Sequence, residues 1–188
     1  MQMPEPISLA GQFLLSLPGM EDPRFAKAVI ALCLHDGDGA FGIDLARADR
    51  SIDLGKIFSQ LLEAAAITTE GDVLTGGPVE PQRGFVLHSL DYLTQDSVSV
   101  DSRWGLSASR TIIQDIANGA GPRTWLFALG YSGWGPNQLE GELTRNGWLI
   151  ANLDFTEIAA IAPENRWEWA YRSMGIAPAS LGIAFGSS

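Results

Sequence analysis

Cys33 and His35 are the two neighbouring residues of this chain whose types are best suited to chemistry. They are two positions apart in an apolar run, so on a β-strand their side chains would point the same way. Cysteine attacks as its thiolate, and a nearby histidine can generate that form. One hypothesis is therefore a thiol-based enzyme or redox sensor that uses Cys33. The alternative is a small buried cysteine in a core strand, with His35 hydrogen-bonded at the following turn.

A metal site would need more ligands than this pair supplies. His88 is the only other histidine, and Asp36 and Asp38 follow His35 closely. The Asp-Gly-Asp-Gly run that ends at Gly39 resembles the start of a calcium loop, but apolar residues follow where further oxygen ligands are required. Aspartate and glycine both tolerate positive φ, so the run predicts a hairpin turn. We expect neither a metal ion nor a cofactor.

A second candidate site begins at the turn Gly76-Gly77-Pro78. Its backbone amides could face an anion. The segment lacks the Lys-Ser/Thr ending of a P-loop and the glycine spacing of a dinucleotide fingerprint. A rigid turn that directs the next strand is the alternative. Arg83 and His88 flank that predicted strand, and both are candidates to contact an anionic group.

A third candidate is a glycine-rich loop that contains Tyr131 and Trp134. Aromatic rings in such a loop can line a pocket or a partner surface, or they can pack over the edge of the core. Glu140 and Glu142 follow in a predicted helix. Two residues apart, they do not share a helix face and make a poor acid/base pair. The sequence contains no Gly-x-Ser-x-Gly elbow, and neither histidine has an aspartate at a position that suggests a triad.

Composition argues against several classes of protein. A chain of 188 residues can bury one sizeable core, so we expect a single domain over residues 1–188. The net charge is −10 without a Lys/Arg run, which disfavours direct binding to nucleic acid. No apolar run reaches the length of about 18 residues expected for a membrane span, and residues 1–9 lack the basic residues of a secretory signal. A single cysteine fits a cytoplasmic protein.

Predicted strands and helices intermix along the chain, and hairpins outnumber βαβ units. This pattern favours an α+β fold with a mixed or mostly antiparallel sheet and about four helices. Predicted strands span residues 11–17, 28–34, 40–45, 84–89, 98–100, 104–106, 123–131 and 148–151. Predicted helices span residues 53–66, 109–118, 136–146 and 164–174, with a further short helix after Asp22. We expect residues 1–9 and 181–188 to be loosely held.

Five separated stretches of the chain resemble the AlgH/YqgE family, in the family's order. They are Gly11-Gln-Phe-Leu-Leu with Pro18-Gly-Met20 and Asp22-Pro-Arg-Phe25; Val29-Ile-Ala-Leu-Cys-Leu-His35 with Gly39-Ala-Phe-Gly42; Gly76-Gly-Pro78 with Arg83-Gly-Phe-Val-Leu-His88; Gly130-Tyr-Ser-Gly-Trp134 with Gln138-Leu-Glu140 and Trp148-Leu149; and Arg166-Trp167 with Gly175-Ile176. The resemblance covers nearly the whole chain. It implies a bacterial, cytoplasmic and largely uncharacterised protein, whose bent, bifurcated sheet forms a pseudo-barrel.

The chain departs from the family pattern at Ala46-Arg47-Ala48, where members of the family commonly carry Asn-basic-Pro. Some members are labelled transcriptional regulators, but no helix-turn-helix is evident in this sequence, and its acidic charge argues against direct contact with DNA. We expect a non-enzymatic binding or regulatory protein. Its binding surface would combine Gly76-Gly77-Pro78, Arg83, His88 and the Tyr131–Trp134 loop. The partner would be a protein or a small molecule.

Overall fold

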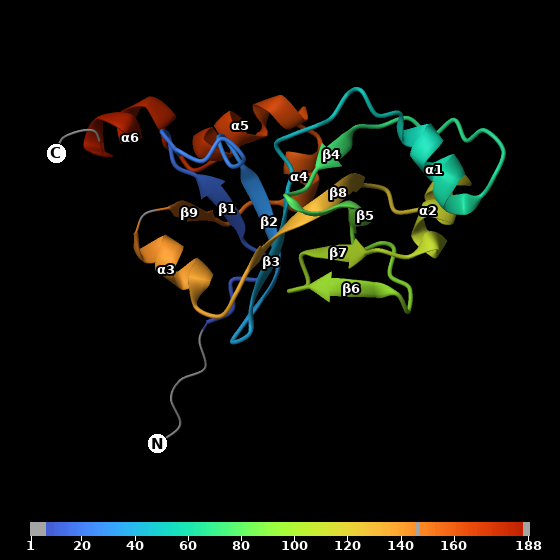
Figure 1. Cartoon of the computed structure of the whole chain (residues 1–188), viewed down its shortest axis with the longest axis horizontal. Coiled ribbons are helices and arrows are strands. Elements are labelled where there is room, and N and C mark those ends of the chain that lie inside the picture. Colours follow the sequence, from blue (N-terminus) through green and yellow to red (C-terminus); the bar gives the residue numbers. More distant parts are fainter. Residues whose placement is uncertain (1–6, 146, 186–188) are drawn as a thin grey trace, which may run out of the picture.

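A curled sheet of nine strands forms the centre of the molecule (Figure 1). The structure, a computed structural model, describes residues 7–145 and 147–185. The strand order is β6-β7-β5-β8-β3-β2-β1-β9, and β4 pairs with β8. Neighbouring strands are antiparallel except β4 and β8, which are parallel. The strands are β1 (Phe13–Ser16), β2 (Val29–Asp36), β3 (Gly39–Asp44), β4 (Val73–Thr75), β5 (Val79–His88), β6 (Ser97–Val100), β7 (Trp104–Ser107), β8 (Trp125–Trp134) and β9 (Trp148–Ala151).

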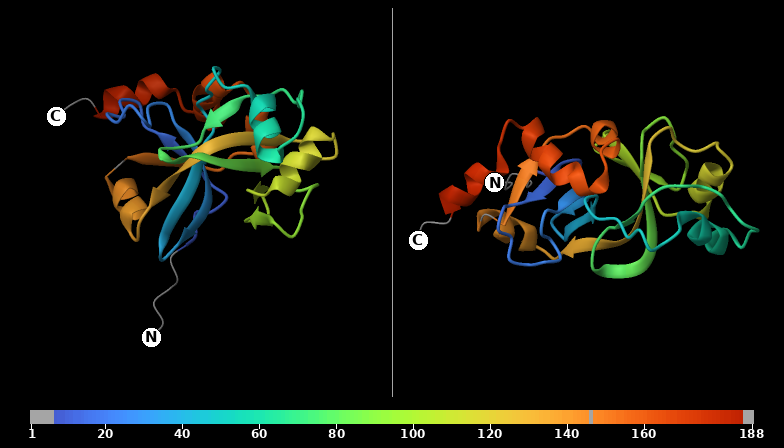
Figure 2. Two further views of the ribbon diagram at one scale, coloured as in Figure 1. Left: turned by 45° about the vertical axis from the view of Figure 1, so that its right-hand side comes forward. Right: turned by 90° about the horizontal axis from the view of Figure 1, so that it is seen from above.

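The helices cover different parts of this sheet. Apolar side chains of α4 and α5 pack into the largest core cluster, those of α1 and α2 into a second cluster, and Leu139 of α3 into a third. Both views of Figure 2 show α1 and α2 at the opposite end of the molecule from α3. The helices are α1 (Leu54–Leu62), α2 (Arg110–Ala117), α3 (Gln138–Thr144), α4 (Phe155–Ala159), α5 (Arg166–Ser173) and α6 (Pro178–Phe185), with a 3-10 turn at Pro163–Asn165.

The α+β class and the curled, mostly antiparallel sheet predicted from the sequence are confirmed. Over the described residues the chain has six α-helices, where the sequence predicted about four. One addition is α4. The other is α6, which makes the predicted loose tail helical as far as Phe185. The remainder of the predicted loose ends, residues 1–6 and 186–188, lies outside the described residues.

The short helix predicted after Asp22 is wrong, because residues 17–28 form a loop of successive turns. The Asp22 carboxylate accepts hydrogen bonds from the Arg24 backbone N–H at 3.0 Å and from the Arg24 guanidinium. Nη2 of Arg47 donates to the carbonyl oxygens of Pro23 at 2.7 Å and Ala26 at 2.8 Å. A helix would use these carbonyl groups within itself. The distant arginine therefore stabilises the loop instead.

None of the helices in the described ranges has the length and apolarity that a bilayer crossing requires.

Candidate functional site

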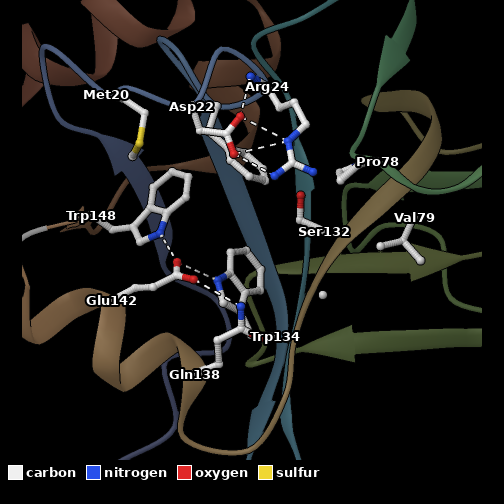
Figure 3. Close-up of a pocket in the computed structure, with 13 residues that line it drawn as sticks. Met20, Asp22, Arg24, Pro78, Val79, Ser132, Trp134, Gln138, Glu142 and Trp148 are labelled. Atoms are coloured by element: carbon white, nitrogen blue, oxygen red, sulfur yellow. Dashed lines mark hydrogen bonds and ion pairs between the residues drawn. The ribbon is translucent and has the colours of Figure 1, made fainter.

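A groove of about 470 Å³ lies between the 17–28 loop, the start of β5, the end of β8 and α3 (Figure 3). We call it the Trp134–Trp148 groove. Its volume falls within the range of about 300–1,000 Å³ that is usual for small-molecule sites. The lining residues are Met20, Asp22, Arg24, Phe25, Pro78, Val79, Ser132, Gly133, Trp134, Gln138, Glu142, Gly147 and Trp148.

The carboxylate of Glu142 holds the two tryptophans in place. Nε1 of Trp134 donates to Oε2 of Glu142 at 3.0 Å, and Nε1 of Trp148 donates to the same oxygen at 2.8 Å. Gln138 Nε2 donates to Oε1 at 3.2 Å. The two indole rings meet edge to face, with centroids 6.3 Å apart. Glu142 thus links α3 to the end of β8 and the start of β9, and its oxygens are already hydrogen-bonded.

The opposite wall of the groove is the 17–28 loop. Phe25 meets Trp148 edge to face at a centroid distance of 5.6 Å, and the Arg24 guanidinium lies 5.5 Å from the Phe25 centroid. Nη2 of Arg24 is 2.7 Å from Oδ2 of Asp22. Hydrogen bonds from Arg24 lower the pKa of the Asp22 carboxyl. The carboxylate therefore stays ionised and fixes the orientation of the guanidinium.

Ser132 contributes an unpaired hydroxyl to the lining. Ser132 is only 2% exposed, and its Oγ has no hydrogen-bond partner among the described residues. Leaving a buried hydroxyl unpaired costs about 1–3 kcal/mol. Successive residues of a strand face opposite sides, so Ser132 and Trp134 share the groove face of β8. Figure 3 shows the Ser132 hydroxyl directed toward the side of the groove that Arg24 occupies.

A smaller hollow of about 140 Å³ shares Arg24, Phe25 and Pro78 with the groove and includes Asp44 and Arg47. Asp44 is 2% exposed and accepts hydrogen bonds from the backbone N–H groups of Val29 at 3.1 Å and Ala46 at 2.9 Å. Burial raises its pKa to about 6, although these hydrogen bonds and the nearby Arg47 oppose the shift. Nε of Arg47 lies 3.7 Å from Oδ2 of Asp44. This pair connects β3 to the 17–28 loop.

The structure brings part of the predicted binding surface together. Pro78 and Trp134 both line the groove, and Gly77 lines the adjoining hollow. Gly76 and Gly77 run directly against β8. A Cβ added at Gly76 would lie 2.3 Å from the Gly130 carbonyl oxygen, and one at Gly77 would lie 2.1 Å from the Tyr131 carbonyl carbon. Close backbone approach therefore explains both glycines, and the turn directs Pro78 toward the groove.

Tyr131 and Arg83 lie away from this groove. Tyr131 faces the other side of β8, where its ring is 4.6 Å from the Phe41 ring and 5.9 Å from the Phe85 ring, centroid to centroid. Arg83 is exposed, lies over Phe85 at 5.2 Å and pairs with Glu80 at 3.3 Å. Side chains alternate between the two faces of a strand, so Tyr131 and Trp134, three residues apart, face opposite sides of β8. The sequence interpretation had placed both on one surface.

His88 also lies away from the groove, in a sealed hydrogen-bond network. It is 0% exposed, and its Nδ1 is 3.1 Å from the Ser89 carbonyl oxygen. A carbonyl oxygen only accepts, so Nδ1 carries the proton and Nε2 accepts from Ser107 Oγ at 2.9 Å. Ser97 Oγ lies 2.9 Å from Ser107 Oγ. Burial lowers the pKa of His88, which keeps the ring neutral. The pairing resembles that of a nucleophile and its base, but the Ser107 hydroxyl already has two partners, Nε2 of His88 and Oγ of Ser97, and Ser107 does not line the groove.

Cys33 and His35 point to opposite faces of the sheet, so the prediction that they point the same way is wrong. The register of β2 against β3 shifts between Leu32 and Leu34, which marks a β-bulge at Cys33. The thiol lies in the largest core cluster, where burial raises its pKa to about 12. His35 pairs across the sheet with Ala40, a member of a different cluster.

The surroundings of each residue agree with a structural role. Nε2 of His35 is 2.7 Å from Oε1 of Glu140, and its Nδ1 accepts from the Leu9 N–H at 3.0 Å. Sγ of Cys33 donates to the Ala31 carbonyl oxygen at 3.4 Å. The structure thus gives no support to a thiol-based enzyme or redox sensor. Nor do the described parts of the chain hold three or more His, Cys, Asp or Glu residues placed to bind a metal ion.

Residues 13–179 match the family described as AlgH-like. The chain belongs to this AlgH-like family. A UPF0301 protein from Rhizorhabdus wittichii is 47% identical over 186 residues, covering 99% of this chain and 100% of that protein. A UPF0301 protein from Novosphingobium aromaticivorans is 44% identical over 179 residues, covering 95% of this chain and 96% of that protein.

Solved structures agree with the AlgH-like assignment. The solution structure of the AlgH protein from Pseudomonas aeruginosa matches with a TM-score of 0.79 and 32% identity, over 100% of this chain and 98% of that one. A crystal structure of a Corynebacterium diphtheriae protein matches with a TM-score of 0.73 over 92% of this chain and 90% of that one. At 20% identity, the second match shows a shared fold alone.

The departure of this AlgH-like chain from the family pattern lies beside the groove. Ala46-Arg47-Ala48 retains the basic residue of the Asn-basic-Pro pattern, and Arg47 is the residue that holds the 17–28 loop. Ala46 donates its backbone N–H to Asp44, so the hydrogen bond there needs no asparagine side chain. Arg47 thus has a structural function in this chain with alanine on both sides of it.

Several groove residues were not predicted from the sequence, namely Met20, Arg24, Phe25, Val79, Ser132, Gln138, Glu142 and Trp148. One spacing in the sequence could have identified two of these residues. Gln138 and Glu142 are four residues apart, which places them on one helix face, but from the sequence Glu142 was compared only with Glu140. Ser132 gave no such signal, because an unpaired hydroxyl is recognised only when its surroundings are known.

Proposed function

We propose that this protein is a non-enzymatic binding or regulatory protein whose ligand or partner occupies the Trp134–Trp148 groove. The observation that carries the proposal is the unpaired, buried Ser132 hydroxyl in the lining of a groove with aromatic walls. Binding sites combine apolar walls with a few polar groups that orient the ligand. Ser132, Arg24, Trp134 and Trp148 supply that combination.

A binding function accounts for the groove better than catalysis does. The carboxylate of Glu142 accepts hydrogen bonds from two indole N–H groups and from Gln138, and the carboxylate of Asp22 is paired with Arg24. A general base needs a free lone pair within reach of a substrate proton. Both carboxylates are instead used to position groove side chains. This supports a role in recognition.

Any regulatory role would act through the partner and not through direct contact with nucleic acid. The chain carries a net charge of −10, so it has no excess of basic residues to displace the counterions of a nucleic acid. We place the protein in the cytoplasm, in keeping with its single, buried cysteine.

The proposal is tested by screening a fragment library against protein with isotope-labelled tryptophan. The six indole N–H resonances are assigned by single substitutions. Groove ligands are expected to shift the Trp134 and Trp148 resonances while leaving that of Trp104, which is 0% exposed in another cluster, unchanged. Trp148→Ala should abolish their binding. Hits that all bind elsewhere and tolerate Trp148→Ala would refute the proposal.

A further inference from the structure

We infer that the ligand of the Trp134–Trp148 groove is a small organic acid, whose carboxylate contacts Arg24 and Ser132 and whose apolar part lies against Met20 and Trp148. This inference rests on the proposed function and adds the chemical class of the ligand. It follows from the donors that remain free in the groove, from the acceptors that are already occupied and from the apolar walls.

Arg24 supplies the first free donor. Its Nε and Nη2 donate to the Asp22 carboxylate, at 3.1–3.2 Å and 2.7 Å respectively. Its Nη1 has no hydrogen-bond partner among the described residues. A guanidinium is planar and carries five N–H groups, so the edge bound to Asp22 fixes the direction of the Nη1 edge. The arginine is thus held in the orientation in which it can bind a second carboxylate.

Ser132 supplies the second donor. Its hydroxyl is directed to the same side of the groove as Arg24 (Figure 3), and it lacks a partner within the part of the chain that the structure describes. A hydroxyl donates to one acceptor, and a carboxylate has two oxygens. One ligand group can therefore accept from Nη1 of Arg24 and from Oγ of Ser132 together.

The acceptors of the groove argue against a cationic ligand. Glu142 lies among aromatic rings, as the anion of an ammonium site would, but its oxygens already accept from Trp134, Trp148 and Gln138. An ammonium ion would have to share this carboxylate with three donors that are already in place. Nη1 of Arg24 can only donate and the Ser132 hydroxyl can donate, so one acceptor group on the ligand satisfies both.

The remaining walls set the size and character of the ligand. Met20, Pro78, Val79 and Trp148 present apolar surface in a groove of about 470 Å³. Thioether, proline and indole groups pack well against alkyl chains and aromatic rings. A compact acid with one alkyl or aromatic part fills such a space, and its carboxylate reaches the donor pair.

The test compares each acid with its uncharged amide of nearly the same shape. Phenylacetate, octanoate and indoleacetate, with their amides, are titrated by calorimetry and by the indole N–H resonances. Wild type should bind at least one acid about tenfold more tightly than its amide. Arg24→Gln should remove that preference. Arg110→Gln, which deletes the same charge from an exposed residue outside the groove, should keep it.

Ser132→Ala separates a ligand contact from a structural role. Since the hydroxyl has no partner among the residues that the structure describes, its removal should leave the melting temperature unchanged or higher. Binding of the acid should nevertheless weaken several-fold. A variant that binds as well as wild type would remove Ser132 from the site and overturn the inference.

Three further outcomes would also overturn it. Equal affinity for acid and amide, with shifts still at Trp134 and Trp148, would exclude the acid class and leave the proposed function standing. Equal loss of affinity in Arg24→Gln and Arg110→Gln would indicate general electrostatic attraction. A short peptide with a free carboxyl end that binds where none of the small acids does, up to about 10 mM, would identify a protein terminus as the source of the carboxylate.

Discussion

The Trp134–Trp148 groove and the network of His88, Ser107 and Ser97 both contain serine hydroxyls in apolar surroundings, but only one of the two regions is closed. In the network, Nε2 of His88 and Oγ of Ser97 both lie 2.9 Å from Oγ of Ser107. In the groove, Oγ of Ser132 has no partner among the described residues. The sequence interpretation placed His88 and Trp134 on one surface, and the structure separates them.

The difference shows that accessibility and hydrogen-bond satisfaction depend on packing and cannot be inferred from residue type. His88 lies against Gly105, where an added Cβ would come within 2.1 Å of Cε1 of the ring. No ligand can enter between them. The groove contains an ordinary serine, yet it has an opening, apolar walls and a free donor. The network stabilises the fold, whereas the groove is available to a ligand.

The largest expected effect concerns Cys33, which is sealed in the same way as His88. Burial raises its pKa to about 12 from a reference of 9.0, so the thiolate is about a thousandfold scarcer than in an exposed cysteine. Iodoacetamide should alkylate the native protein at least that much more slowly than the protein in urea. The two rates are measured by mass spectrometry. Comparable rates would mean that this region opens readily.

Removal of the His88 side chain should destabilise the fold by about 3 kcal/mol, because it leaves a cavity and deprives Ser107 of one of its two hydrogen-bond partners. Urea unfolding of His88→Ala measures this change. Ser132→Ala in the groove is the matched control and should change the free energy of unfolding by less than about 0.5 kcal/mol, or raise it. Similar losses in both variants would abolish the distinction between the two regions.

Asp44, beside the groove, should make stability depend on pH. Its folded-state pKa is about 6 against a reference of 3.8, so the folded protein binds the proton more tightly than the unfolded chain. The stabilisation that this proton binding adds to the free energy of unfolding is therefore fully present below about pH 4 and is lost as the pH rises through 6. Between pH 4 and pH 7, the free energy of unfolding of Asp44→Asn should rise by on the order of 2 kcal/mol relative to that of wild type. Urea unfolding across this range tests the slope, and a constant difference would contradict the assignment.

Glu142→Gln should have the smallest effect, a loss of about 1 kcal/mol. Glutamine retains one acceptor oxygen but presents an amide N–H₂ group in place of the other, so the hydrogen bonds from Trp134, Trp148 and Gln138 cannot all persist. The indole N–H resonances of both tryptophans should move. Glu70→Gln, at an exposed residue outside the groove, provides the control. Unmoved indole resonances in Glu142→Gln would show that the negative charge of Glu142 does not influence the two indole N–H groups.

The sequence was sufficient to predict the fold class, most strands and helices, and the family. These features depend on local patterns. Apolar runs such as Val29–Cys33 form strands buried on both faces, and the helical spacing of Leu54, Ile57 and Phe58 forms α1. The turn at Gly76-Gly77-Pro78 was also predicted as a rigid corner, and both glycines run against β8.

The candidate site was predicted only in part, because its residues come from five separate segments of the chain. Pro78 and Trp134 line one groove, whereas Tyr131 and Arg83, which the sequence interpretation placed on the same surface, lie elsewhere. The loop conformation of residues 17–28 also depends on a distant side chain. Arg47 binds two of the loop's carbonyl groups, and no pattern within the loop reports that contact.

What the sequence by itself determined is therefore the order and type of the elements, since hydrophobic period and turn residues act over a few positions. Only the tertiary structure decided which face each side chain takes and whether its polar atoms are satisfied. A bulge against β3 turns Cys33 away from His35. The packing around β8 leaves Ser132 without a partner in the described parts of the chain, whereas Ser107 is hydrogen-bonded to His88. Strand register and hydrogen-bond partners are properties of contacts between distant segments, and these contacts exist only in the folded chain.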